Sequence, residues 1–320
     1  MTPATAAVST ELIEELARPE PPGPTILDLP NGIHEGVPGT QYYARVLGVA
    51  SNSILTKFAR AEVLYHLWVT GQLPDESTKA LNFGIAFHMA VLEPDQYARQ
   101  YAAEPDFGYC VAHQPSGTTK EQGAENKKRR DAWRAAHAGA VRLDSDDALH
   151  IAGMRESLLR HPLVRTMVER GRRETTVKWE DEETGVICKS RMDTWLDGIA
   201  LIGDLKSTVD ARPDAFARSV EKYGYARQAV FYPQGVHAVT GTHQRFAMVA
   251  CEKRPPYLSA VYTLAPDALR VGQYECRVLL RRFRRCIDRG VWRGLPQGIT
   301  ELALRPWYEP ETDDEENEDQ

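Results

Sequence analysis

Two neighbouring apolar runs carry the charged residues that most constrain how this chain can fold. The first contains Asp193, the second contains Asp204 and Lys206, and Leu196-Asp197-Gly198 lies between them as a candidate turn. Two runs joined in this way are typical of a β-hairpin, which would place the two aspartates side by side. Side chains alternate along a strand, so Asp204 and Lys206 point to the same face. The sequence therefore predicts two carboxylates and one ammonium group that converge on one point.

Paired carboxylates beside a lysine are typical of sites that hydrolyse phosphodiester bonds with a divalent metal ion. Carboxylate oxygens hold a hard cation such as Mg²⁺ or Mn²⁺ and leave positions open for water and a phosphate oxygen. A lysine can orient the attacking water or stabilise the charge that develops on the phosphate. The alternative is a solvent-facing hairpin with an ordinary salt bridge, and these residues alone do not separate the two.

A second acid-x-lysine triplet, Glu125-Asn126-Lys127, has the same spacing but different surroundings. It lies in a polar segment with no apolar run around it, whereas Asp204-Leu205-Lys206 closes a hydrophobic run. Short triplets of this kind arise by chance in a chain of ordinary composition. We therefore place the candidate site at Asp204 and interpret Glu125 as a decoy.

His88 lies on a predicted apolar helix at 78–92, one turn after Gly84. A lone histidine in such surroundings is more often a core residue than a ligand. Imidazole is nevertheless a competent ligand for Mn²⁺, and a glycine one turn earlier permits close approach by DNA.

Three other polar residues have ordinary interpretations beside functional ones. Gln228 and Tyr232 are one turn apart on a second predicted helix, a spacing that also fits a plain amphipathic helix. Glu174 opens the first predicted strand and is either a further acid near the site or an exposed charge at a strand end, of which we favour the exposed charge.

The remaining secondary structure follows from the period of the apolar residues. Residues 174–208 change to a period of two and predict three antiparallel strands. Helices are expected around them at 51–71, 144–160, 213–232 (ended by Pro233) and 267–289. An apolar stretch at 245–252 and a strand at 257–264 lie between the last two helices. Residues 1–31 form a Pro-rich arm that we expect to be flexible, 32–308 one domain that is helical to about 170, and 309–320 a disordered acidic tail.

The net charge of −6 hides an uneven distribution. Residues 309–320 hold eight of the 45 acids, so the remaining 37 acids face 39 lysines and arginines and carry a net charge of +2. Basic clusters at 127–130, 170–173 and 281–285 are either solvated helix faces or contacts for phosphate. A nearly neutral body with local basic clusters is compatible with a DNA partner.

Composition excludes several classes of protein. No run approaches the roughly 18 apolar residues of a membrane span, and the N-terminus lacks a signal peptide, so we expect a cytoplasmic protein with no membrane partner. The five cysteines include no C-x-x-C pair. This spacing argues against a zinc ribbon or an iron–sulfur cluster and favours reduced thiols.

The ordered set of candidate residues resembles the RecB-type branch of the PD-(D/E)xK nuclease superfamily. The order is Gly-x-x-x-His at 84–88, then Asp193, Asp-x-Lys at 204–206, and Gln-x-x-x-Tyr at 228–232. More narrowly, residues 32–308 are similar to the nuclease domain of the exonuclease VIII (RecE) family. The stretches that carry this likeness lie between residues 32 and 44 and at 81–94, 179–185, 188–193 and 204–208. Tyr223-Gly224-Tyr225 before Gln228, and Trp292 with Gly294, also fit.

The resemblance implies an α/β fold: a restriction-endonuclease-like core with a mixed central β-sheet flanked by helices, plus an N-terminal helical portion. It implies a Mg²⁺ or Mn²⁺ cofactor held by His88, Asp193, Asp204 and the backbone carbonyl of Leu205. Lys206 would be the catalytic lysine. Gln228 and Tyr232 would support the lysine or the DNA end.

Members of this family degrade linear duplex DNA from 5′ ends, form ring-shaped tetramers and pass the exposed 3′ strand to a single-strand annealing protein. The resemblance thus implies a metal-dependent DNA exonuclease that serves phage-type recombination. Three alternatives stay open: a nuclease of the CRISPR-adaptation or AddB kind, an endonuclease of the same superfamily, and a non-catalytic DNA-binding module. The irregular cysteines count against the first, and the complete Asp193, Asp204 and Lys206 set counts against the last.

Overall fold

The computed structural model describes residues 23–302 except 76 and 113–115, so most of the predicted N-terminal arm and the whole acidic tail lie outside the described residues. Within this part of the chain, a mixed sheet has the order β1-β5-β6-β7-β8-β9, and β2 pairs with β6. Its strands are β1 (Gly32–His34), β2 (Val49–Ala50), β5 (Arg172–Glu180), β6 (Ile187–Leu196), β7 (Leu201–Thr208), β8 (Arg245–Glu252) and β9 (Ser259–Tyr262).

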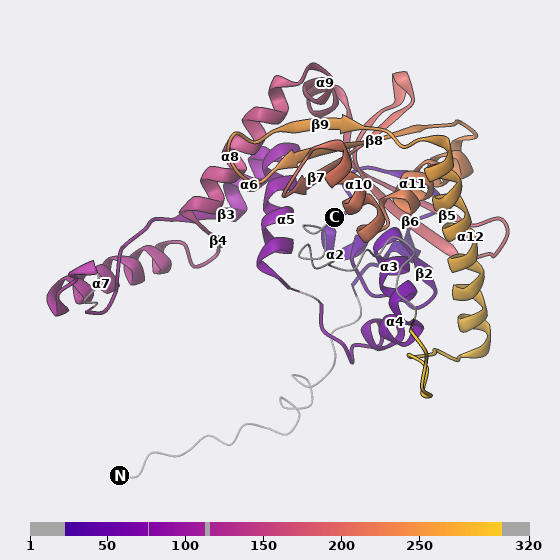
Figure 1. The fold of residues 1–320 in the computed structure, drawn as a ribbon, viewed down its shortest axis with the longest axis horizontal. Coiled ribbons are helices and arrows are strands. Elements are labelled where there is room, and N and C mark those ends of the chain that lie inside the picture. Colours follow the sequence, from indigo (N-terminus) through magenta and orange to yellow (C-terminus); the bar gives the residue numbers. More distant parts are fainter. Residues whose placement is uncertain (1–22, 76, 113–115, 303–320) are drawn as a thin grey trace, which may run out of the picture.

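Helices cover both faces of this sheet, as Figure 1 shows. One face carries α3 (Asn52–Arg60), α10 (Pro213–Tyr223), α11 (Tyr225–Thr240) and α12 (Pro266–Arg289). The opposite face carries α5 (Lys79–Leu92), α8 (Ser145–Arg160) and α9 (Pro162–Arg170). The other helices are α2 (Gly39–Tyr42), α4 (Glu62–Val69), α6 (Pro94–Gln100) and α7 (Lys120–Ala136), with short 3₁₀ turns at η1 (Ile26–Asp28) and η3 (Asp197–Ile199). The predicted α/β class, with a mixed sheet between helices, is confirmed.

The predicted run of three antiparallel strands is also confirmed. Strand β5 pairs with β6 along most of its length, and β6 pairs with β7 on either side of the η3 turn. Strand β8 then lies parallel to β7, which requires a crossover connection, and α10 and α11 supply it. This crossover carries Gln228 back to the strands that hold the acids.

Strand β8 is apolar along its interior because helices bury both of its faces. Phe246 and Met248 pack into the cluster on the α11 side, while Ala247 and Val249 pack into the cluster on the α5 side. Continuous apolar runs are typical of strands that are covered on both faces. Each large side chain that is fully buried contributes roughly 1.5–3 kcal/mol, so these two clusters fix the helices on the sheet.

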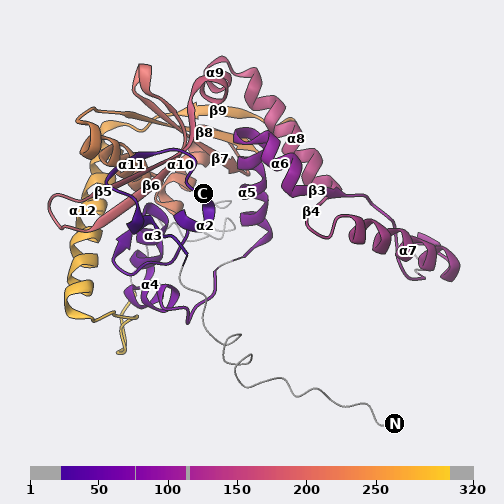
Figure 2. The same ribbon diagram turned by 180° about the vertical axis from the view of Figure 1, so that it is seen from behind.

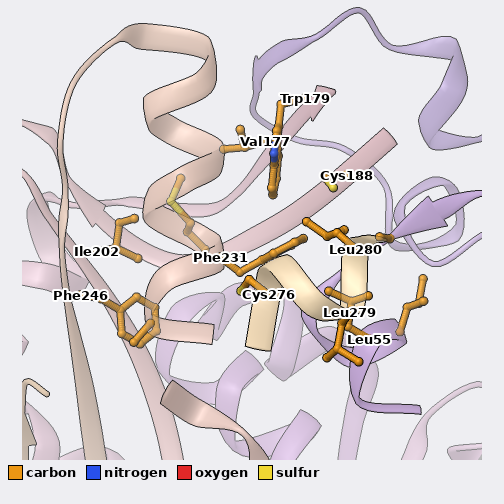
Figure 3. Close-up of a cluster of buried hydrophobic side chains, with 14 of the residues drawn as sticks. Leu55, Val177, Trp179, Cys188, Ile202, Phe231, Phe246, Cys276, Leu279 and Leu280 are labelled. Atoms are coloured by element: carbon orange, nitrogen blue, oxygen red, sulfur yellow. The ribbon is translucent and has the colours of Figure 1, made fainter. Parts of the chain in front are cut away.

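Figure 3 shows the cluster on the α11 side, where Phe231 projects from α11 toward Trp179 of β5. The centroids of these two rings are 4.9 Å apart at an interplanar angle of 56°. Cys276 and Leu280 of α12 and Ile202 of β7 lie in the same cluster. Helix α11 is therefore held between the sheet and α12.

The single helix predicted at 51–71 is wrong, because the chain forms α3 and α4 with a break at Ala61. Ser51 caps α3 as expected, with its hydroxyl accepting from the backbone N–H of Ile54. Ala61 is extended, at φ −165° and ψ 137°. The N–H of Val63 in the first turn of α4 then donates to the carbonyl of Arg293 at 3.0 Å. A contact with such a distant part of the chain leaves no local signal in the sequence.

The helix predicted at 213–232 is likewise divided, and it ends later than expected. Gly224 takes the left-handed conformation at φ 66° and separates α10 from α11. Pro233 lies inside α11, which runs on to Thr240. A proline inside a helix costs about 3 kcal/mol. Burial of Phe231 and Val236 on either side of it offsets that cost.

Helix α7 stands away from the sheet in both Figure 1 and Figure 2. It is carried by β3 (Tyr101–Glu104) and β4 (Val141–Asp144), which form a separate two-stranded parallel sheet. Glu125 is exposed on this helix. The decoy triplet is therefore remote from the paired acids, as its polar surroundings indicated.

All five cysteines are free thiols, and four of them are buried. Burial raises the pKa of Cys188 well above its usual value and that of Cys276 to about 12, so these thiols stay protonated near neutral pH. Among the described helices, none has the length and apolar character that crossing a membrane requires.

Candidate active site

The candidate site lies where strands β6 and β7 part. Their ladder ends at Thr194 and Gly203, and Asp193 and Asp204 occupy the next position on each strand. In place of another ladder bond, the N–H of Leu205 donates to Asp193 Oδ2 at 2.7 Å. Both aspartates are buried. The hairpin thus brings the two carboxyl groups together, as the sequence predicted.

Lys206 and Gln228 form the side of the site that faces α11. The ammonium group of Lys206 pairs with Asp204 Oδ2. It also donates to Gln228 Oε1 at 2.9 Å, while Gln228 Nε2 donates to Asp204 Oδ1 at 2.6 Å. The ring of Tyr225 lies 4.3 Å from Lys206 Nζ, a cation–π contact that the sequence did not indicate. Gln228 therefore holds both charged groups in place.

His88 reaches the site from the opposite helix layer, on α5. Its Nδ1 lies 3.2 Å from Asp193 Oδ2. Burial opposes protonation of the ring, but the neighbouring carboxylates of Asp193 and Asp204 outweigh it and raise the pKa of His88. The site thus draws residues from both helix layers and from the two strands between them.

The two carboxyl groups do not share one electrostatic environment. Burial favours the protonated form of both. At Asp193 the charge and hydrogen bond of His88 reverse that effect and lower the pKa. At Asp204 burial and the charge of Asp193 outweigh Lys206 and raise the pKa. A second negative charge is therefore costly here unless a further cation stabilises it.

Tyr232 lies one turn after Gln228 and is partly buried beneath the site. Its ring meets the ring of Phe246 edge-on, with centroids 5.9 Å apart at 86°. Burial raises the pKa of Tyr232 well above its usual value, so the phenol stays neutral. Its predicted support of the lysine or the DNA end stays a prediction.

The interpretation of Glu174 as an exposed charge at a strand end is wrong. Its neighbours on β5 pair with Thr194 and Met192, which places Glu174 opposite Asp193. Its side chain is only 27% exposed and lies 3.9 Å from Arg191. Burial, together with the charge of Asp193, raises the pKa of Glu174 to about 7. Counting the register outward from the predicted hairpin would have found this neighbour.

The residues present fit a divalent cation in their chemistry. Within the described residues, no group of three or more His, Cys, Asp or Glu side chains is arranged to hold a metal ion. In this arrangement Asp193 contacts His88 and the N–H of Leu205, and Asp204 contacts Lys206 and Gln228. Asp204 Oδ2 is buried and lies against the ammonium group of Lys206. Two carboxylates with an imidazole are ligands that Mn²⁺ and Mg²⁺ accept.

Gly84 faces open space one turn before His88, since a Cβ built there would meet nothing within 4 Å. Glycine inside a helix is less favourable than alanine by about 0.5–1 kcal/mol. We therefore expect Gly84→Ala to raise the free energy of unfolding by that amount in urea titrations. A loss of stability instead would mean that the space beside His88 is filled.

Residues 51–296 match the family described as a PDDEXK-like domain of unknown function (DUF3799). The chain belongs to this family. The PDDEXK-like family lies in the PD-(D/E)xK superfamily that the ordered motifs resembled, which supports a nuclease. The narrower likeness to exonuclease VIII stays a prediction.

Several solved chains match this PDDEXK-like chain. One of them is the crystal structure of a protein from Eubacterium rectale described as a candidate exonuclease, with a TM-score of 0.56 and 16% sequence identity. The match covers 84% of this chain and 96% of the other. At this identity the likeness shows the fold alone. No curated protein matches the chain.

Proposed function

We propose that this protein is a Mg²⁺- or Mn²⁺-dependent exonuclease that hydrolyses linear double-stranded DNA from its 5′ ends. The observation that carries the proposal is the convergence of Asp193, Asp204 and Lys206 where β6 and β7 part, with Gln228 and His88 closing the site from two helix layers. Membership in a PDDEXK-like family supports phosphodiester hydrolysis. The sequence resemblance to exonuclease VIII supports the choice of DNA ends.

His88, Asp193, Asp204 and the carbonyl of Leu205 are the groups that would hold the metal ion. When bound, a divalent cation polarises the phosphate and lowers the pKa of a bound water. The chain's own contribution is to keep two carboxylates adjacent in a buried place, where the attraction for a cation is stronger than in water. A cation there would share Asp204 Oδ2 with the ammonium group of Lys206.

Lys206 supplies positive charge beside these acids. Its side chain is 13% exposed, and its ammonium group is held by Gln228 on one side and the ring of Tyr225 on the other. A donor fixed in this way needs no reorganisation when charge develops on the phosphate. Gln228 is a positioning residue in this scheme, since it acts through Lys206 and Asp204.

The proposal includes a role and partners for the protein. Resection of 5′ strands would leave 3′ single strands for a single-strand annealing protein during phage-type recombination. A ring-shaped homotetramer around duplex DNA, in the cytoplasm, would keep the enzyme on its substrate. The sequence resemblance alone supports these parts of the proposal.

Digestion of linear and circular duplex DNA tests the activity directly. Each substrate is incubated with Mg²⁺, with Mn²⁺ or with a chelator, and the linear DNA is labelled at either the 5′ or the 3′ end. We expect metal-dependent loss of linear DNA only, with early release of the 5′ label. Cutting of circles would replace the exonuclease with an endonuclease, and early release of the 3′ label would reverse the polarity. Intact DNA under every metal condition would remove the nuclease proposal.

A further inference from the structure

A pocket of about 630 Å³ opens between the α3–α4 junction and the end of α12, and none of the candidate catalytic residues lines it. The ends of α4 and α12 lie side by side in both views of the molecule (Figure 1, Figure 2). Its charged lining consists of Arg60, Arg282, Arg285, Arg289, Arg293 and Glu62. Among the described residues, five guanidinium groups therefore share the pocket with one carboxylate.

That single carboxylate is already engaged. Glu62 is largely buried, pairs with Arg282 at 3.0 Å and accepts the backbone N–H of Arg293 at 3.1 Å. Burial opposes ionisation of Glu62, but these two hydrogen bonds outweigh it and lower the pKa of the carboxyl group. Arg285, Arg289 and Arg293 form no ion pair with any acid in the described part of the chain. The pocket thus keeps an excess of positive charge.

The backbone that shapes the pocket is firmly held. Gly290 ends α12 in the left-handed conformation at φ 63°, and this allows the chain to turn back across the start of α4. The carbonyl of Arg293 accepts the N–H of Val63 at 3.0 Å, and the ring of Trp292 stacks on His66 with centroids 5.2 Å apart. The arginines therefore project from fixed positions rather than from a loose tail.

The spacing of the α12 arginines gathers like charges on one side of the helix. Arg282, Arg285 and Arg289 stand three and four residues apart, so they lie on one face and repel one another. A bound anion would remove that repulsion, and guanidinium groups match phosphate oxygens with two parallel hydrogen bonds. We propose that this pocket binds backbone phosphates of a DNA strand away from the bond that is cut. The proposal rests on the nuclease function proposed above.

Helix α3 links the pocket to the candidate active site. Asn52 at its start accepts a hydrogen bond from Arg227 at 3.0 Å, and Arg227 directly precedes Gln228. Arg60, at its other end, lines the pocket. A helix of this length spans about 13.5 Å. One strand of duplex DNA advances about 3.4 Å per phosphate, so the length of α3 corresponds to about four nucleotides of one strand.

The salt dependence of DNA binding tests the pocket. A short fluorescein-labelled duplex is titrated in chelator, which prevents cutting, and the slope of log K against log salt is measured. Each phosphate contact contributes about 0.9 to that slope. We expect Arg285→Ala/Arg289→Ala to reduce the slope by roughly 1.8 and to lower affinity at physiological salt about tenfold or more. Both side chains are exposed, so the variant should keep the melting temperature of the wild type.

The matched control is Arg281→Ala/Arg284→Ala. It removes the same charge from the same helix, but Arg281 already pairs with Glu183 and Arg284 with Asp288. We expect its slope to stay within about 0.5 of the wild-type slope, since these side chains do not line the pocket. An equal decrease of the slope in both variants, or an unchanged slope in the pocket variant, would overturn the proposal. Loss of inorganic phosphate binding with unchanged DNA binding would also overturn it, since the pocket would then serve a free anion.

Cleavage assays on the same proteins separate this inference from the proposed activity. If the wild type cuts linear DNA but the two variants show equal slopes, the pocket assignment fails and the nuclease stands. If the slope falls in the pocket variant alone while no protein cuts DNA, the pocket assignment stands and the nuclease proposal fails. Among active proteins, the pocket variant should raise KM for long duplexes and leave KM for a dinucleotide substrate unchanged.

Discussion

Replacing Lys206 with alanine should lower kcat for cleavage of linear DNA by about 10²–10³-fold, the usual effect of removing one preorganised charge donor. The physical reason is its position. Lys206 Nζ is held against Asp204 and Gln228 in a nearly closed site, where its charge is poorly screened. The measurement is steady-state cleavage of end-labelled duplex at saturating Mg²⁺ or Mn²⁺. KM should change little, since the lysine acts on charge that develops during the reaction.

Lys79→Ala is the matched control for this variant. Lys79 begins α5, the helix that carries His88, but its side chain is 73% exposed and pairs with Asp144 and Asp147 on the surface. We expect its kcat to stay within about twofold of the wild-type value, because exposed ion pairs contribute little. Lys206→Arg should recover only part of the activity, since the planar guanidinium group cannot replace a compact ammonium group. Wild-type kcat in Lys206→Ala would remove the lysine from the mechanism.

A loss of activity in Lys206→Ala needs to be separated from a loss of folding. Removing one partner of a buried ion pair is destabilising by about 3–5 kcal/mol when the remaining charge stays buried. Asp204 is left in that position, although protonation of its carboxyl group relieves part of the cost. Urea unfolding of the variant in parallel with the kinetic assay therefore decides whether the protein assayed is folded.

The hairpin of the candidate site could be predicted from sequence because everything that defines it is local. Asp193 and Asp204 are 11 residues apart, and the alternation on each strand fixes which face each side chain takes. The structure adds one feature that no local pattern encodes. The ladder stops at Thr194 and Gly203, so the strands part at the acids and the N–H of Leu205 turns to Asp193.

Only the family resemblance predicted that His88 and Gln228 belong to the site. Each lies on a helix whose apolar pattern is ordinary, and their meeting depends on how two helix layers cover opposite faces of the sheet. The parallel pairing of β7 with β8 returns α11 to the strands, and no spacing in the sequence specifies that crossover. Long-range packing, rather than propensity, decides these contacts.

Residues whose role depends on register or on distant segments were interpreted less well. For Glu174 an exposed charge was preferred over an acid near the site, because its partner Asp193 lies on the next strand. The cluster at 281–285 was treated as one basic patch. In the structure it divides, because Arg281 and Arg284 pair with acids while Arg285 faces a pocket completed by Arg60 and Arg293.

Gly272→Ala should destabilise the protein by about 3 kcal/mol, at the upper end of the range for overpacking a core. A Cβ at this position would lie 2.2 Å from the carbonyl oxygen of Ala226 and 3.0 Å from the backbone nitrogen of Arg227. Both atoms belong to the backbone of α11, which cannot rotate away as a side chain can. The gain of up to about 1 kcal/mol from placing alanine in a helix is too small to compensate. The free energy of unfolding in urea measures the effect.

The same substitution should also disturb the candidate site, because the backbone atoms that must move belong to the two residues before Gln228. Any shift of α11 away from α12 changes the hydrogen bonds of Gln228 to Lys206 and Asp204. We therefore expect kcat to fall in the fraction that remains folded. Gly84→Ala is the control, since it adds the same methyl group to a helix in open space and should have the opposite sign. Equal stability of the two variants would show that α11 and α12 do not pack backbone to backbone at Gly272.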